Sequence, residues 1–553
     1  MTRIGQSGRA HPLYAALFTA AAFLICWTLT GCGGGSAVDT AGVTASSSNA
    51  RASSVTVPEI RWALNVKEPS LNVYTETTPE NLDLISNIGQ GLLSFNSAGR
   101  VQPGLASSWT QASPTVYTYK IKSGERFSDG KPVTPTDILY SFHYMMNPKT
   151  GGQSAGYFTN VKSITADGGD QIRVTLTKPQ SDWNSLIAGT GLSVFEKSAL
   201  ESAGSKFGSP SGIPIGSGPY KITEFTNDHA TFVPNPYYDG PPPKVQRVVV
   251  QFITDDATRR TAMESGDLDG TSFVPPTETP QWERVASVNL QSVLSGTFFA
   301  WLFNPQKPPF NDIHVRRAIM YAFNREAIIK DVLHGNAALS RGMVVPQFFV
   351  NEMSSAQAQE RINREAPEYP FDMERAKAEL AKSPVSGGFS FTALTTELKE
   401  ETLTLQVLKQ QLKALGIEMK VQTVSPTVQY EKLEHGEFSA LTSVGVMEPL
   451  TPLGFLNALL CSCQLPPLGD DFWRYKNAEV DRLLSGAFAS TDPTKIGEDN
   501  IRVLAIAQRD LPITTAWYDK TIVALNKKYV LTDFGSWSML ETPWMANIRA
   551  VAG

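Results

Sequence analysis

The stretch from Pro214 to Gly240, with the sequence PIGSGPYKITEFTNDHATFVPNPYYDG, most constrains the fold of this chain. Two short runs, Tyr220–Phe225 and Ala230–Val233, flank the polar dipeptide Asn227-Asp228, and glycines and prolines open and close the stretch. This pattern predicts a β-hairpin bounded by tight turns. The Gly216-Ser217-Gly218 triplet does not predict a phosphate loop, because a proline and a strand follow it where such a loop requires a helix.

Length and charge narrow the class of protein. A chain of 553 residues is too long for one ordinary core, so we expect two or three domains. The formal net charge is -5, and no long basic run occurs. Nucleic acid is therefore not expected as a partner, since its binding requires a cationic surface that releases counterions.

The N-terminus has the layout of a secretory signal. Arg3 and Arg9 precede an apolar run, Leu13–Leu29, that is short for a membrane span. The run ends in Leu29-Thr30-Gly31-Cys32, which resembles the lipobox of bacterial lipoproteins. That resemblance implies a signal peptide over 1–31 and lipidation of Cys32. An uncleaved membrane helix is the alternative.

Residues 32–54 are rich in Gly, Ser, Ala and Thr and show no periodicity. This composition predicts a flexible tether between the lipid and the folded body. Only Cys461 and Cys463 then remain in the mature fold. Their spacing leaves a free pair and a strained disulfide equally open, and it offers too few ligands for a metal site.

Strand-like and helix-like segments alternate through the rest of the chain. Asp312, Asn324 and Asp372 are each placed to cap a helix. Glu400–Leu415 repeats leucine at helical spacing and stops at Gly416, as a helix with a C-terminal glycine does. Strands interleaved with helices predict the α/β class.

The chain also carries, in order, the blocks LASSW, YTYKIKSGERFSDGKPVTPTDILYSF, IPIGSGPYKITEF, NPYYDG, PPFNDIHVRRAIMYAFNREAI and FDMERAKAEL. This order resembles the extracellular solute-binding proteins of ABC importers, in the peptide- and nickel-binding family 5. The resemblance runs from about Leu64 to Trp544. Each block alone is a weak indication of this family, whereas all six in this order are a specific one.

The resemblance implies a two-lobe periplasmic-binding-protein fold of the Venus flytrap type, with an extra subdomain in the first lobe. Two lobe crossings are expected, near Phe298–Asn304 and Leu511–Trp517. The expected division is lobe I over 55–295 with the inserted subdomain at about 96–205, lobe II over 296–513, and a C-terminal segment, 514–553, that returns to lobe I.

The implied function is capture of a short peptide between the lobes and its delivery to an ABC permease with ATPase subunits. We expect an extracytoplasmic, lipid-anchored monomer without a cofactor, a metal or catalytic residues. The alternatives are the same fold with a metal chelate or an opine-like ligand, and a secreted hydrolase. No nucleophile has a visible base beside it, which disfavours the hydrolase. The pairs Asp255-Asp256 and Asp470-Asp471 are expected at the solvated surface.

The segment Ser443–Leu456 is the first candidate for ligand contact. Counting back from Pro452 and Phe455, the resemblance places Glu448 where relatives carry an acid that grips a peptide's α-ammonium group. Gly445, Val446 and Met447 would lie beside it. Relatives usually have Asp at this position, and Pro449 follows it here, so a solvated loop acid is the alternative.

A second wall of the site is expected from Thr77, Thr78 and Pro79, whose backbone groups would pair with an extended ligand. The alternative for these three residues is an ordinary surface loop. Trp301 and Trp517 lie at the two expected crossings and would contact ligand if their rings face the site. Burial in the core is the alternative for both.

Overall fold

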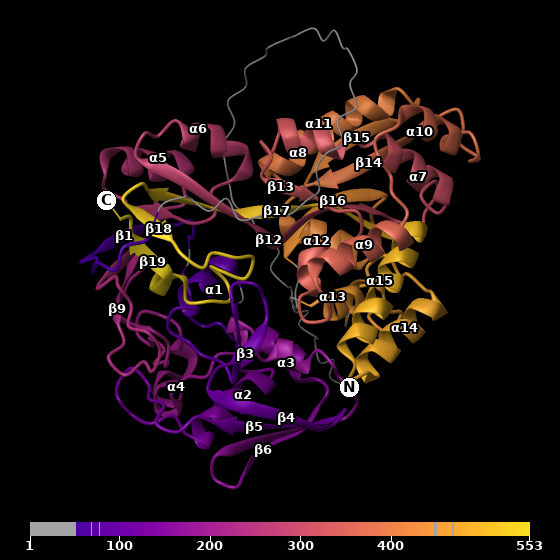
Figure 1. The fold of residues 1–553 in the computed structure, drawn as a ribbon. Helices are drawn as coiled ribbons and strands as arrows, with labels where there is room; N and C mark the ends of the chain where they lie inside the picture. Colours follow the sequence, from indigo (N-terminus) through magenta and orange to yellow (C-terminus); the bar gives the residue numbers. More distant parts are fainter. Residues whose placement is uncertain (1–50, 68, 77, 447–450, 467–468, 553) are drawn as a thin grey trace, which may run out of the picture.

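The computed structural model describes residues 51–552 except for positions 68, 77, 447–450 and 467–468. Two bodies lie beside each other in Figure 1, one formed by indigo and magenta segments and one by orange segments. Both contain strands and helices, which confirms the predicted α/β class. The predictions for Cys32, Thr77, Met447 and Glu448 lie outside the described residues, as does the signal segment.

A mixed sheet of eleven strands runs through both bodies. In spatial order its strands are β15 (Glu418–Thr423), β14 (Ser390–Thr395), β16 (Ala440–Val446), β12 (Val288–Phe303), β17 (Ile513–Asn526), β11 (Gly270–Thr271), β1 (Ile60–Leu64), β10 (Val248–Phe252), β9 (His229–Pro234) and β8 (Tyr220–Phe225), and β13 (Ala337–Leu339) pairs with β17.

Three smaller sheets complete the strands. They are β4 (Ala106–Ser113), β5 (Val116–Ile121), β7 (Gln171–Leu176) and β6 (Val161–Asp167); β2 (Leu93–Phe95) with β3 (Val101–Pro103); and β18 (Tyr529–Leu531) with β19 (Ile548–Ala550).

The α-helices of the first body are α1 (Pro79–Ile85), α2 (Pro135–Met146), α3 (Trp183–Leu186), α4 (Lys197–Ala203), α5 (Asp256–Ser265) and α6 (Thr279–Glu283). Those of the second body are α7 (Ile313–Ala322), α8 (Arg325–Asp331), α9 (Ser355–Glu365), α10 (Met373–Leu380), α11 (Lys399–Lys413), α12 (Pro426–Glu434), α13 (Pro452–Leu460), α14 (Ala478–Ala489) and α15 (Pro493–Asp510). None of the helices in the described ranges is long and apolar enough to cross a membrane.

The predicted helix signals hold. Asp312 caps α7 and Asn324 caps α8, each accepting a backbone N–H bond with its side chain, and Asp372 accepts two at the start of α10. Helix α11 ends at Lys413, and Gly416 follows with a φ of +71°. Such a left-handed φ costs glycine little, so the chain turns there into β15.

The predicted hairpin is confirmed as β8 and β9, at one edge of the large sheet. The turn before it packs against the segment after α1, where a Cβ at Gly216 would lie 2.1 Å from the Ile88 carbonyl oxygen. Only a residue without a side chain permits that approach. The glycines of this stretch therefore set the packing of two backbone segments.

The strands β12 and β17 join the two bodies in Figure 1. They pair antiparallel from Val288↔Asn526 to Leu302↔Ile513, with an irregularity between Leu294 and Phe298. Both expected crossings fall at or beside these strands. The lobe and subdomain boundaries proposed above stay predictions.

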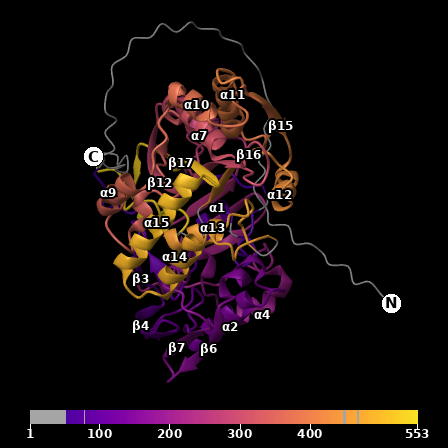
Figure 2. The same ribbon diagram turned by 90° about the vertical axis from the view of Figure 1, so that its right-hand side faces the viewer.

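A second contact joins the bodies at their lower ends. The view in Figure 2 shows α14 and α15 above the indigo and purple sheet of β4, β6 and β7. The Ser181 backbone N–H donates to the Phe488 carbonyl oxygen at 3.1 Å, and the Ser181 hydroxyl donates to the Ala487 carbonyl at 2.9 Å. The bodies are thus held together at the strand pair and at this lower contact.

The C-terminal segment packs on the first body through a buried polar cluster. The Trp544 indole N–H donates to Asp83 Oδ1 at 2.7 Å, and the Ser272 hydroxyl donates to Asp83 Oδ2 at 2.9 Å. The Trp62 indole N–H donates to the Ser272 hydroxyl oxygen at 2.9 Å. Residues far apart in sequence thereby share one satisfied carboxylate.

The expectation that the paired aspartates lie at the solvated surface is wrong for one member of each pair. Asp256 is 8% exposed and Asp471 is fully buried, whereas Asp255 and Asp470 are exposed. The dipeptide at 255–256 begins a helix instead of lying on a strand. Asp255 accepts the Thr258 N–H at 2.7 Å as the cap of α5, which turns the next side chain inward.

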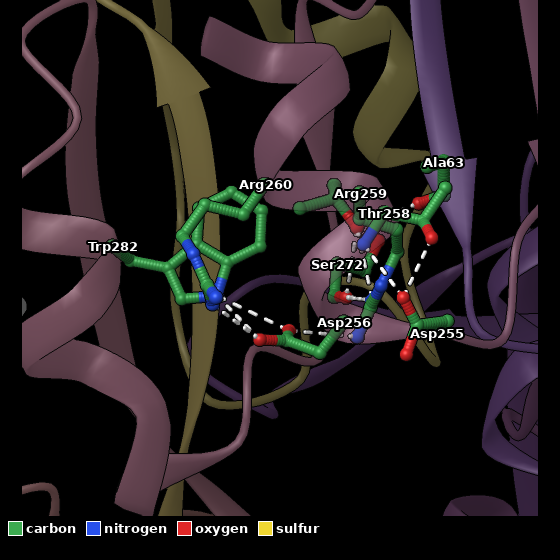
Figure 3. A network of polar contacts seen from close by, with 9 residues as sticks. Ala63, Asp255, Asp256, Thr258, Arg259, Arg260, Ser272 and Trp282 are labelled. Carbon is green, nitrogen blue, oxygen red and sulfur yellow. Dashed lines mark hydrogen bonds and ion pairs between the residues drawn. The ribbon is translucent and has the colours of Figure 1, made fainter.

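Figure 3 shows the network that Asp256 enters. Its carboxylate accepts from Arg259 at 3.1 Å and from Arg260 at 3.0 Å. The Trp282 indole N–H donates to the same carboxylate at 3.1 Å. Arg259 is fully buried, and the carboxylate of Asp256 forms an ion pair that balances its charge.

The open question about the two remaining cysteines has an answer in the structure. Cys461 and Cys463 form a disulfide at the end of α13. The bridge closes a very short loop. It therefore joins no distant parts of the fold.

The packing at Gly216 can be tested by adding one methyl group. Gly216→Ala is expected to lower the free energy of unfolding by about 1–3 kcal/mol, because the new Cβ overlaps a backbone carbonyl. Urea denaturation measures the change. Gly156→Ala is the matched control, since a Cβ there meets nothing within 4 Å. Equal effects of the two changes would contradict the close approach.

The two neighbouring aspartates provide a second test. Asp256→Asn is expected to lower the free energy of unfolding by about 3–5 kcal/mol, because it leaves the buried Arg259 charge without its partner. Asp255→Asn should lower the free energy of unfolding by only about 0.3 kcal/mol, since Asn caps helices as well as Asp does. Chemical denaturation of both variants compares them. A large loss of unfolding free energy in Asp255→Asn, with none in Asp256→Asn, would contradict the role of Asp256 as the partner of the buried Arg259.

Candidate functional site

The strand pair positions the two predicted tryptophans. Side chains alternate across β12, so Phe299 and Trp301 lie on one face. Phe299 stacks on Trp517 with ring centroids 4.3 Å apart and planes 15° apart. Trp301 and Trp517 are both fully buried in the core of the second body. Contact of either ring with ligand stays a prediction, and the Trp301 indole N–H has no hydrogen-bond partner among the described residues.

The predicted wall at Thr78 and Pro79 is the start of α1. The Thr78 hydroxyl accepts the Asn81 N–H at 3.2 Å as the helix cap, and Pro79 opens the first turn. Glu80, the next residue, is partly exposed, yet burial raises the pKa of its carboxyl to about 7.

Gly445 and Val446 lie at the end of β16, where they pair with Phe298 and Thr297 of β12. The description resumes at Thr451, whose hydroxyl caps α13 by accepting the Gly454 N–H at 3.1 Å. The predicted ligand segment therefore starts beside the irregularity of β12 and ends at α13.

Thr451 also contacts the first body, since its hydroxyl donates to Asp182 Oδ2 at 3.3 Å. Burial raises the pKa of Asp182 to about 6. Burial, with a smaller effect of the Asp182 charge, raises the pKa of Glu352 to about 8. Asp182 belongs to the first body and Glu352 to the second. Two desolvated acids thus meet where the bodies approach each other.

A carboxylate pair that the sequence did not indicate lies beside Trp517. The Trp517 indole N–H donates to Glu400 Oε1, at the start of α11, at 2.9 Å. Asp519, two positions along β17, projects from the same strand face as Trp517. The Ser295 hydroxyl donates to the Asp519 backbone carbonyl at 3.0 Å, which ties this point to the irregular part of β12.

The two carboxylates are strongly desolvated. Burial raises the pKa of Glu400 to about 7 and that of Asp519 well above its usual range, and the Glu400 charge adds to the effect on Asp519. Asp519 is 6% exposed, and its Oδ1 atom has no hydrogen-bond partner among the residues that the structure describes. Within the described part of the chain, no cation forms an ion pair with either acid.

The structure brings Gly445, Val446 and Trp517 to neighbouring strands, through the pairing of β16 and β17 with β12. Thr78 and Pro79 lie on a separate element, and none of their hydrogen bonds in the described ranges reaches those strands. Within these ranges, no three His, Cys, Asp or Glu side chains are grouped to hold a metal ion.

One signal could have indicated Asp519. It is a charged residue within the run ITTAWYDKTIVALN, which is otherwise typical of a buried strand. Glu400 stands in the run KEE at a helix start, where acids usually favour the helix dipole and face solvent. Its approach to Asp519 depends on tertiary packing that no local pattern contains.

Known proteins resemble this chain over most of its length. The model of the bacterial extracellular solute-binding proteins, family 5 Middle, matches residues 100–464. The probable D,D-dipeptide-binding periplasmic protein DdpA of Escherichia coli K12 is 26% identical over 437 residues, which cover 77% of this chain and 81% of that protein.

Solved structures share the fold. The periplasmic binding protein DppA of Helicobacter pylori, in complex with the peptide STSA, has a TM-score of 0.73 at 22% identity and covers 90% of this chain and 99% of its own. The PBP AgaA of A. tumefaciens R10, in complex with agropinic acid, has a TM-score of 0.72 at 20% identity with the same coverage. The two-lobe fold expected from the sequence is therefore confirmed. The chain belongs to the family 5 bacterial extracellular solute-binding proteins.

Proposed function

We propose that this chain is the solute-binding component of an ABC importer, and that it captures a short peptide between its two bodies and delivers it to a membrane permease. The observation that carries this proposal is the family match over 100–464, which contains β12, β16 and the helices α7 to α13 of the second body. Relatives named for dipeptide binding support a peptide as the solute.

Capture proceeds by movement of the two bodies about β12 and β17. A ligand stabilises the closed arrangement only through contacts that it makes better there than in an open one. The contacts of Ser181 and Thr451 across the lower ends are of the kind that such a closed arrangement adds. No catalytic role is proposed for the chain.

The N-terminal segment supports attachment to a bacterial membrane. We propose cleavage before Cys32 and acylation of that cysteine, with residues 33–54 as a tether for a monomeric body. Acylation at more than one position of that residue gives stable anchoring, whereas a single chain binds membranes only marginally. The anchor keeps the binding protein near its permease.

A non-peptide solute is the second candidate. The fold neighbour with agropinic acid favours it, as do the departures from the peptide-binding pattern around Glu448. No basic residue stands at Thr442 or Ser443, where some relatives meet a peptide carboxylate.

Native mass spectrometry of the protein purified without ligand removal distinguishes the two candidates. We expect added mass that fragments into amino acid residues, because captured peptide should survive gentle purification. A copurified opine or chelate would replace the peptide proposal with the second candidate. Cleavage of added peptides would contradict a purely binding role.

Glu448 is proposed as the anchor for the α-ammonium group of the peptide. Glu448→Gln is then expected to weaken peptide binding about tenfold or more, since a hydrogen bond to a charged group contributes about 1.5–3 kcal/mol. Isothermal titration calorimetry measures the affinity. The exposed Glu437, changed to Gln, is the control. Unchanged affinity in Glu448→Gln would remove the anchor.

A further inference from the structure

The carboxylates of Glu400 and Asp519 come together from two elements that meet only in the folded chain. Glu400 is the second residue of α11, and Asp519 lies in the middle of β17. The Trp517 indole N–H donates to Glu400 at 2.9 Å, and Asp519 projects from the same strand face as Trp517. The indole therefore lies beside both acids.

The Asp519 side chain is the independent observation that points to a ligand. It is 6% exposed, and its Oδ1 has no hydrogen-bond partner among the described residues. A buried acceptor without a partner costs about 1–3 kcal/mol, and more when it is charged. Native structures rarely keep such an atom without a ligand, an ion or an ordered water.

The nearest lysines along the chain are already engaged elsewhere. Lys399, next to Glu400, pairs with Glu278 of the first body. Lys520, next to Asp519, donates to the Gly335 carbonyl oxygen at 3.0 Å. Neither is therefore placed to neutralise the two acids, and no other described cation pairs with them.

The chemistry of the pair favours an organic cation. Two carboxylates beside one indole donor leave several acceptor positions open, which match the three donors of an ammonium group or the forked donors of a guanidinium. A bound Ca²⁺ or Mg²⁺ ion requires about six or more oxygen ligands in a compact shell. The described residues contain no group of three metal-ligating side chains at this point.

The pair also lies where the two bodies meet. The ion pair of Lys399 with Glu278 joins α11 to the first body, and the Asn336 amide donates to the Thr279 hydroxyl at 3.1 Å beside it. Glu400 itself is partly exposed. The pair therefore lies beside the junction at which a solute between the bodies would be held.

We propose that Glu400 and Asp519 form a cation subsite, which binds a primary ammonium or guanidinium group of the captured solute. The inference rests on the proposed function, because it assigns a chemical class to the solute captured between the bodies. It is separate from the proposed role of Glu448, since it concerns a second positive charge on the ligand. The preferred peptides then carry a lysine-like or arginine-like side chain.

Calorimetric titration of the full-length protein tests the subsite with matched probes. The peptide probes are tripeptides of alanine with lysine or norleucine at the first, second or third position, which differ in one ammonium group. The small probes are 1,5-diaminopentane and the neutral 1,5-pentanediol. The variants are Glu400→Gln and Asp519→Asn, and Glu397→Gln is the control because Glu397 is an exposed acid of the same segment.

We expect lysine to bind at least about tenfold more tightly than norleucine at one of the three positions, which corresponds to about 1.4 kcal/mol. Glu400→Gln and Asp519→Asn should remove this preference, and Glu397→Gln should keep it. Equal binding of lysine and norleucine peptides at every position would overturn the cation subsite and leave peptide capture intact.

Failure of the proposed function gives a different result. If no peptide binds, peptide capture is overturned and the small probes decide the subsite. Binding of 1,5-diaminopentane but not 1,5-pentanediol, lost in Glu400→Gln, would support it. Absence of diamine binding would overturn it as well.

Thermal unfolding without ligand checks that the variant folds. Burial raises the folded-state pKa of Glu400 to about 7, so its ionised form destabilises the fold increasingly as the pH rises from the unfolded value toward 7. Glu400→Gln is therefore expected to raise the unfolding midpoint at pH 8 and to change it less at pH 5. A lower midpoint at pH 8 would show that the acid already has a stabilising partner, and would contradict the subsite.

Discussion

The antiparallel pairing of β12 with β17 is the interaction on which the rest of the structure depends. Its register places Phe299 against Trp517 and sends these rings into the core of the second body. The irregularity after Leu294 occurs where β16 ends on one flank and β13 pairs with Asp519 on the other. The proposed site therefore lies where both bodies share the continuous strands β12 and β17.

Asp256 and Asp83 in the first body differ from Asp519 and Glu400 at this junction in the number of donors that contact them. Asp256 accepts from two arginines and an indole, and Asp83 accepts from a tryptophan and a serine. Among the described residues, Asp519 Oδ1 has no hydrogen-bond partner, and Glu400 accepts from the Trp517 indole. Since burying an unpaired charge is costly, an unsatisfied buried acid is a candidate for ligand contact.

Local patterns in the sequence predicted local structure well. The hairpin and the caps at Asp312 and Asp372 depend on neighbouring residues alone, and ordered family blocks predicted the fold. Asp256 was misplaced because its inward turn depends on the helix that begins at this residue, with Asp255 as its cap. Glu400 and Asp519 were missed because only tertiary packing of α11 over β17 brings them together. The loop containing the predicted ammonium anchor lies outside the described residues, so that part of the site stays a prediction.

The most direct test of this account is a crystal structure of the protein with the solute that copurifies with it. The account predicts ligand density between the two bodies, beside the ends of β16 and α1, with a nitrogen atom of the ligand within hydrogen-bonding distance of Glu400 or Asp519. Ligand bound elsewhere, or bound at this place with a neutral or anionic group facing the two acids, would contradict it.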